Sequence, residues 1–214
     1  MEHSIKIAVI GGTGKAGKYL VNQLLNQGYK IKLVVRNLDH FQIQSPLIEV
    51  IQGSVSDYGV VYQLVEDCQV VISVLGLGQS NSEISIFSQS TKNVLSAMKA
   101  WNVRRYIVIT GLNVDTPFDQ KSPKTKFATD WMKTNYPLTT SDKQLEYNIL
   151  TNSDLDWTLV RLPLIEQTEE KRGVIVSVED CLGDKISATD LAIFLIEQLT
   201  DRTYVRKAPF LANG

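Results

Sequence analysis

The most constraining feature of this chain is a glycine-rich turn placed between an apolar strand and a helix. Residues 5–10 form a mostly β-branched run of the kind found in buried parallel strands. Gly11, Gly14 and Gly17 follow at intervals of three, and the next residues carry leucine and valine at helical spacing. In such a turn the first glycine permits a sharp bend, the second lets a ligand approach the backbone, and the third lets the helix pack on the strand.

The start of the helix after this turn is a predicted anion site. The first N–H groups of a helix lack partners within it, and the helix dipole places positive charge there. A pyrophosphate suits such a position. The spacing here is Gly-x-x-Gly-x-x-Gly rather than Gly-x-Gly-x-x-Gly, but the flanking strand and helix supply the context that makes the motif informative.

Composition excludes several other classes of protein. The net charge of −1 gives no basic surface for nucleic acid or for an anionic membrane. No apolar run approaches the ~18 residues of a membrane span, and the first strand begins too early for a signal peptide. Cys68 and Cys181 are isolated, so we expect neither a metal site nor a disulfide framework. These features predict a cytoplasmic protein with buried or half-buried thiols.

Strands and helices alternate five times in the first half of the chain. The predicted strands cover residues 5–10, 31–35, 47–52, 70–75 and 104–110, and Ser56 or Asp57 is expected to cap the helix before residue 66. A helix over 138–151, strands over 156–161 and 173–178, and a helix capped by Ser187 follow. This pattern predicts an α/β fold, with residues 1–214 forming one Rossmann-like domain around a doubly wound parallel sheet.

The end of the second strand bears on cofactor choice. In dinucleotide-binding folds an acidic residue there binds the ribose 2′-hydroxyl, whereas an arginine suits a 2′-phosphate. Arg36 occupies that place, about 25 residues after Gly11. Its guanidinium can form paired hydrogen bonds with phosphate, so the sequence favours NADP over NAD. Lys15 in the glycine turn is either a second cation for the phosphates or a solvated side chain.

Residues 111–138 interrupt the alternation. This stretch mixes charged residues, three prolines and scattered aromatic side chains. Connections this long are usually functional or mobile. Two interpretations stay open: a lid that covers a substrate, or a solvated insertion with a short helix near 127–134.

The whole pattern resembles the atypical short-chain dehydrogenases/reductases of the NAD(P)H-binding, NmrA-like family, and within it the small biliverdin-IXβ reductase and flavin reductase group. The resemblance covers nearly the whole chain. Its motifs are Gly11–Gly17, Val34-Val35-Arg36, Gly53-Ser54-Val55, Leu75-Gly76, Asn93–Ala100, Leu155–Pro163 and Lys185–Ala192.

The resemblance implies a set of cofactor-binding residues. They are Gly11, Thr13, Gly14, Lys15, Ala16 and Gly17 at the pyrophosphate, Arg36 at the 2′-phosphate, Ser54 and Val55 at the adenine, and Leu75, Gly76, Thr110, Pro163 and Leu164 along the ribose and nicotinamide. Two positions depart from the family. Ser54 replaces a usual aspartate, and Gly111 replaces the serine that follows the threonine in the biliverdin-IXβ reductase group.

The Tyr-x-x-x-Lys pair that most short-chain dehydrogenases use is absent, because no tyrosine has a lysine four residues later. This argues against a sugar epimerase or an alcohol dehydrogenase of that type. Hydride transfer to a flat conjugated acceptor needs less, since the acceptor is electron-poor and its proton can come from solvent. Thr110 and Lys143 are the candidate catalytic residues, although Lys143 could instead be a solvated helix lysine. Arg161 is interpreted as structural.

Two main functions are compatible with these residues. The first is an NADPH-dependent reductase of a small flat acceptor such as a flavin, a quinone or a tetrapyrrole. The second is a non-catalytic sensor that binds NADP(H) and a protein partner. Besides these two, a weaker alternative is an assembly factor that uses the fold as a scaffold. We expect a monomer or a weak dimer.

Overall fold

The computed structural model describes residues 5–38, 41, 43–76 and 85–214. Its main sheet has eight strands in the order β3-β2-β1-β4-β5-β6-β10-β8. The strands are Lys6–Ile10 (β1), Lys30–Val35 (β2), Ile48–Gln52 (β3), Val70–Ser73 (β4), Arg105–Gly111 (β5), Asp156–Leu162 (β6), Ile175–Ser177 (β8) and Phe210–Ala212 (β10). All pairs are parallel except β10 with β8. A Rossmann-like α/β domain is therefore confirmed, and the edge strand β8 lies within the predicted 173–178 but runs antiparallel, a direction that the sequence did not indicate.

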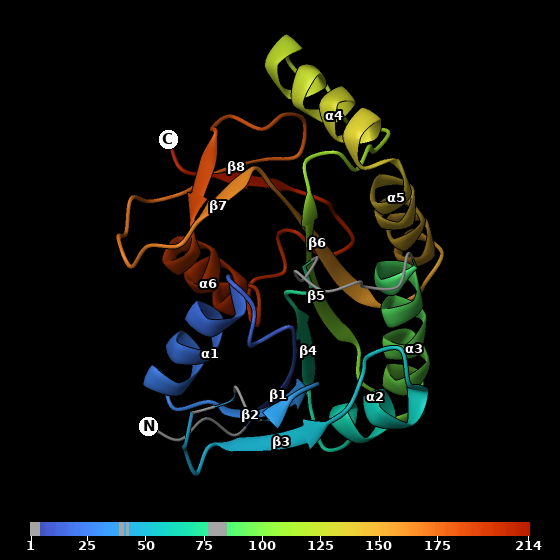
Figure 1. Cartoon of the computed structure of the whole chain (residues 1–214), viewed down its shortest axis with the longest axis vertical. Coiled ribbons are helices and arrows are strands. Elements are labelled where there is room, and N and C mark those ends of the chain that lie inside the picture. The colour runs from blue at the N-terminus through green and yellow to red at the C-terminus, as the bar shows by residue number, and fades with distance from the viewer. Residues whose placement is uncertain (1–4, 39–40, 42, 77–84) are drawn as a thin grey trace.

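Helices cover both faces of the sheet (Figure 1). Gly17–Asn26 (α1) and Ala188–Glu197 (α6) lie together on one face; Tyr58–Val65 (α2), Ile86–Ala100 (α3) and Pro137–Thr151 (α5) lie on the other. Each layer encloses its own cluster of buried apolar residues, so the strands between them are apolar on both sides. A separate parallel pair joins Leu164–Glu166 (β7) to Lys185–Ser187 (β9).

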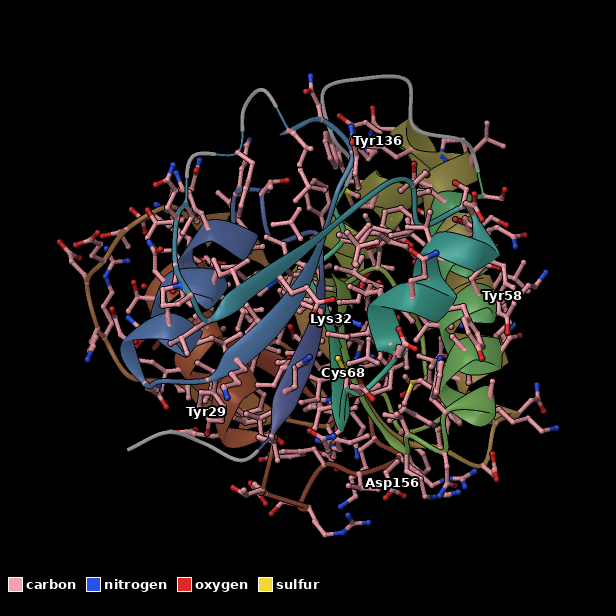
Figure 2. All side chains as sticks on the ribbon, turned by 90° about the horizontal axis from the view of Figure 1, so that it is seen from below. Tyr29, Lys32, Tyr58, Cys68, Tyr136 and Asp156 are labelled. Atoms are coloured by element: carbon pink, nitrogen blue, oxygen red, sulfur yellow. The ribbon has the colours of Figure 1, made fainter. Side chains whose placement is uncertain are left out.

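Several local predictions are confirmed. Asp57 caps α2 by accepting from the N–H of Gly59, and Ser187 caps α6 by accepting from the N–H of Asp190. Cys68 and Cys181 are free and buried, and Figure 2 shows Cys68 inside the fold near Lys32. Lys32 is a buried residue of β2 whose ammonium donates to two carbonyl oxygens near the C-terminal end of α2. Such a cation suits the negative end of a helix.

The insertion is more regular than expected. Its helix, Pro123–Asn135 (α4), is longer than the predicted 127–134, because Ser122 caps it and proline occupies its first position. A second helix, α5, begins almost at once at Pro137. In Figure 1, α4 projects beyond the sheet on the side of the carboxyl ends of β5 and β6. The polar run Gln79–Ser85, which the sequence predicts to be a loop after the fourth strand, falls almost wholly outside the described residues.

Candidate functional site

The glycine turn has the shape that a close ligand approach requires. Gly11 has φ +77°, and a side chain there would meet the Val74 carbonyl oxygen at 2.7 Å. A side chain at Gly17 would collide with the carbonyl oxygen of Gly11. Thr13, Gly14 and Lys15 form the exposed tip of the turn. Within the described chain no N-cap side chain bonds to the start of α1, and the N–H groups from Lys18 to Leu20 donate to carbonyl oxygens of the turn. The N–H groups before Lys18 are therefore the ones that fit a phosphate.

Other predicted cofactor residues lie at the same edge of the sheet. Arg36 is exposed directly after β2, and Ser54 and Val55 follow β3. The Asn93 side chain donates to the Val55 carbonyl oxygen at 2.9 Å, which fixes that loop. The Ser54 hydroxyl bonds with Ser56, and the Ser54 carbonyl oxygen accepts from the N–H of Asp57. The fold thus aligns these positions, and their roles as cofactor ligands stay predictions.

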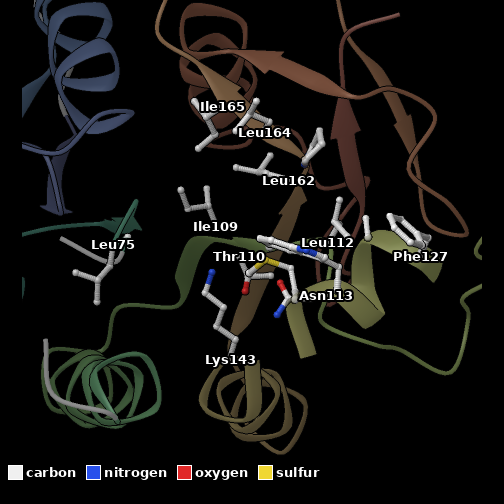
Figure 3. A pocket seen from close by; sticks show the side chains of 16 residues that line it. Leu75, Ile109, Thr110, Leu112, Asn113, Phe127, Lys143, Leu162, Leu164 and Ile165 are labelled. Atoms are coloured by element: carbon white, nitrogen blue, oxygen red, sulfur yellow. The ribbon is translucent and has the colours of Figure 1, made fainter. Parts of the chain in front are cut away.

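A large apolar cavity of about 570 Å³ opens at the carboxyl ends of β5 and β6 (Figure 3). Its lining comes from four regions of the chain: Leu75 and Gly76 after β4; Ile109, Thr110, Gly111, Leu112 and Asn113 at the end of β5; Phe127, Ala128, Trp131, Met132 and Lys143 from α4 and α5; and Leu162, Pro163, Leu164 and Ile165 from β6 and β7. Six residues singled out from the sequence therefore meet here, namely Leu75, Gly76, Thr110, Lys143, Pro163 and Leu164.

Lys143 is the charged residue of this cavity lining. It extends from α5 toward Thr110, as Figure 3 shows, and its ammonium lies 4.9 Å from the centre of the Phe87 ring. It has no hydrogen bond or ion pair with any residue in the described part of the chain. Burial lowers the pKa of Lys143, and the nearby Glu146 opposes that shift. An unpaired ammonium in an apolar cavity can hold and deliver a proton.

Asn113 occupies the space left by the missing side chain at Gly111. A Cβ at position 111 would collide with the Asn113 Oδ1 atom and would lie 3.6 Å from the Lys143 Nζ atom. Where the resemblance to the biliverdin-IXβ reductase group implies a serine, this chain has a glycine that makes room for an asparagine. Asn113 Oδ1 and Thr110 Oγ1 are both buried, and neither has a partner among the described residues.

Glu146 lies one helical turn after Lys143, in the interface between α5 and α3. One oxygen of its carboxyl group accepts from the Thr91 hydroxyl at 2.8 Å, and the second oxygen is buried without a described partner. Burial raises the pKa of Glu146 to about 8. Asp142, on the same helix, accepts from the N–H groups of Phe87 and Ser88 and so anchors the start of α3.

The structural interpretation of Arg161 is confirmed. Its side chain is fully buried, pairs with Asp119 at 2.6 Å and stacks 3.5 Å from the centre of the Phe210 ring.

Asn113 and Glu146 were missed by the sequence analysis, since neither belongs to a recognisable motif. Of the described residues, none forms a cluster of acidic, His and Cys side chains able to hold a metal, and no helix is long and apolar enough to cross a membrane.

Comparison with known proteins places this geometry in a family. The UPF0659 protein YMR090W of Saccharomyces cerevisiae is 25% identical over 228 residues, covering 98% of this chain and 94% of the yeast protein. A short-chain dehydrogenase/reductase from Veillonella parvula in complex with NADP has a TM-score of 0.79 at 20% identity, covering 98% of this chain and 94% of that one. ChuY, an anaerobillin reductase from Escherichia coli O157:H7, has a TM-score of 0.80 at 17% identity, covering 97% of both chains.

The two structural likenesses show a shared fold at low identity. The family model described as NAD(P)H-binding matches residues 11–202, a span that runs from the glycine turn through α6. This chain therefore belongs to the NAD(P)H-binding family.

Proposed function

We propose that this protein is an NADPH-dependent oxidoreductase that reduces a flat conjugated acceptor such as a flavin, a quinone or a tetrapyrrole. The observation that carries the proposal is the 570 Å³ apolar cavity, which opens beside Thr110 and Leu75 and contains the unpaired Lys143. No tyrosine lines it in the part of the chain that is described. A site of this kind suits an acceptor whose reduction needs positioning more than acid catalysis.

The chain's own residues would orient the cofactor from the glycine turn toward the cavity. Gly11, Gly14 and Gly17 leave room for the pyrophosphate at the start of α1. Arg36, exposed at the end of β2, would bind the 2′-phosphate and favour NADP over NAD. Leu75 lies against the glycine turn and also lines the cavity, so it connects the two parts of the site. The bound dinucleotide supplies a hydride to the acceptor.

The cavity walls would hold the acceptor and exclude water. Phe127 and Trp131 of α4 offer aromatic surfaces for a planar ring, and both side chains are exposed. Leu164 is 66% exposed across the same cavity. Covering these side chains would stabilise a bound acceptor, which supports the lid interpretation of α4. Lys143 would hold the proton that neutralises the reduced acceptor.

The relatives are compatible with this proposal. ChuY is named as a reductase of anaerobillin, and the Veillonella protein was crystallised with NADP. Both share the fold at low identity, so the acceptor of this chain has to be found by experiment.

The test is a turnover assay with purified protein. NADPH oxidation should be faster than NADH oxidation when FMN, a benzoquinone or biliverdin is added, and it should fall sharply in Lys143→Met. NADP binding without turnover of any acceptor would overturn the proposal and would favour the non-catalytic sensor, particularly if a protein partner were recovered.

A further inference from the structure

The strongest unassigned arrangement in the fold is an unpaired cation facing an unpaired oxygen inside the cavity. Lys143 Nζ and Asn113 Oδ1 both converge on the point where a side chain at position 111 would begin. Asn113 is almost fully buried, and its Oδ1 atom has no partner among the described residues. Figure 3 shows both side chains reaching toward Thr110 from opposite elements, the helix α5 and the loop after β5.

The orientation of the Asn113 amide follows from its neighbours. The Thr140 hydroxyl donates its single proton to the Met132 carbonyl oxygen at 3.3 Å. It can therefore only accept from Asn113, whose Nδ2 atom lies 3.0 Å away. With its nitrogen bound to Thr140, the amide must present its oxygen to the Gly111 side, where the lysine lies.

The carboxylates near Lys143 have other roles. Asp142 accepts from the N–H groups at the start of α3, and Glu146 accepts from Thr91 in the helix interface. The Phe87 ring offers only its face to the ammonium. Asn113 Oδ1 and Thr110 Oγ1 are the buried neutral oxygens without a described partner in this cavity lining, and Asn113 Oδ1 is the one that shares the space beside Gly111 with the ammonium of Lys143. A neutral oxygen there favours the protonated lysine while burial opposes its charge.

We propose that Asn113 is a positioning residue that orients Lys143 into the acceptor cavity and keeps it protonated. Gly111 is part of the same device, because any side chain there would displace the Asn113 oxygen. Thr140 fixes the amide and links it to Met132 of α4, so one hydrogen-bonded chain joins Asn113 to the helix that covers the cavity. This inference rests on the proposed function for its catalytic meaning.

The first test needs no turnover. The protein is reductively methylated with ¹³C-formaldehyde, and the pH titration of the Lys143 signal is followed by NMR, with Lys143→Arg identifying the signal. Asn113→Leu, which keeps the shape and removes the oxygen, should raise the acid dissociation constant of Lys143 about tenfold, because the partial negative charge that the amide oxygen places beside the ammonium is lost. Asn148→Leu, an exposed site on the same helix, should leave it unchanged.

A second variant guards against misfolding of the first. Gly111→Ala retains Asn113 but pushes its oxygen away, so the acid dissociation constant of Lys143 should rise in this variant as well. If Glu146→Gln moves the Lys143 titration while Asn113→Leu and Gly111→Ala do not, Glu146 is the partner and the proposal is overturned.

A turnover assay provides a test that is independent of the NMR titration. Asn113→Leu should lower kcat/KM for the acceptor and move the alkaline limb of the pH profile to lower pH in the wild-type background. It should have no further effect in Lys143→Met, because it acts through the lysine. An equal loss in both backgrounds would show a purely structural role. If no acceptor is turned over, the proposed function fails while the NMR titration still decides the role of Asn113.

Discussion

Glu146 makes the stability of this protein depend on pH in an unusual direction. Its carboxyl group is buried between α5 and α3, and burial raises its pKa from an ordinary 4.5 to about 8. The folded state therefore binds the proton more tightly than the unfolded state does. The stabilisation is complete below about pH 4.5 and is lost as pH rises through about pH 8.

The size of this change in stability follows from the pKa shift of Glu146. Each unit of pKa difference corresponds to ~1.4 kcal/mol, so the free energy of unfolding should fall by several kcal/mol, at most about 5, across this interval. Relaxation around the ionised group brings the observed value below that limit. Glu146→Gln keeps the shape and the Thr91 contact but cannot ionise, so it should be increasingly more stable than wild type as pH rises.

The measurement is urea unfolding followed by circular dichroism from about pH 5 to about pH 9. The informative quantity is the difference in the free energy of unfolding between wild type and Glu146→Gln at each pH. The other titrating groups are common to both proteins, so their contributions cancel. Glu197→Gln, an exposed position on α6, is the matched control and should follow wild type at every pH. A difference that stays constant with pH would refute the assignment of a protonated Glu146.

Three further predictions concern the cofactor and the cavity. Arg36→Ala should weaken NADPH binding by about 1.5–3 kcal/mol and leave NADH binding nearly unchanged, as measured by fluorescence titration; equal losses would contradict a 2′-phosphate contact. Gly17→Ala should abolish dinucleotide binding because its methyl group would collide with Gly11, and undiminished NADPH binding by this variant in the same titration would contradict the assignment of the glycine turn. Phe127→Ala should raise KM for the acceptor and leave the NADPH dissociation constant unaltered, and a change in NADPH affinity alone would argue against α4 as part of the acceptor site.

The strands and helices of the first half of the chain could be predicted because their signals are local. The apolar run before Gly11 and the cap at Asp57 each specify an element from adjacent residues. The short strands β7, β9 and β10 could not be predicted this way. Each has three residues, and β10 is defined by pairing Phe210 with Arg161 and Ser177, which are far away in sequence. The full length of α4 was signalled by Ser122 and Pro123 but was underestimated.

The residues of the candidate site likewise include some that the sequence indicated and others that only the structure revealed. Lys143 was singled out from the sequence, yet its unpaired state and its cavity emerge only when β5, α4, α5 and β6 are packed together. Asn113 carries no sequence signal, because its importance depends on Gly111 being empty and on Thr140 holding its amide. A resemblance to the family indicated that a hydroxyl was missing at position 111 but could not indicate what filled its place.

The sequence by itself determined the class of ligand. A strand, three glycines and a helix start are contiguous, so backbone sterics and the helix dipole are sufficient to specify a dinucleotide turn. Only the tertiary structure decided how the acceptor end of the site is built. That end is assembled from separate segments spread between Leu75 and Ile165, and the space, burial and unpaired polar atoms that give it chemical character exist only once those segments meet.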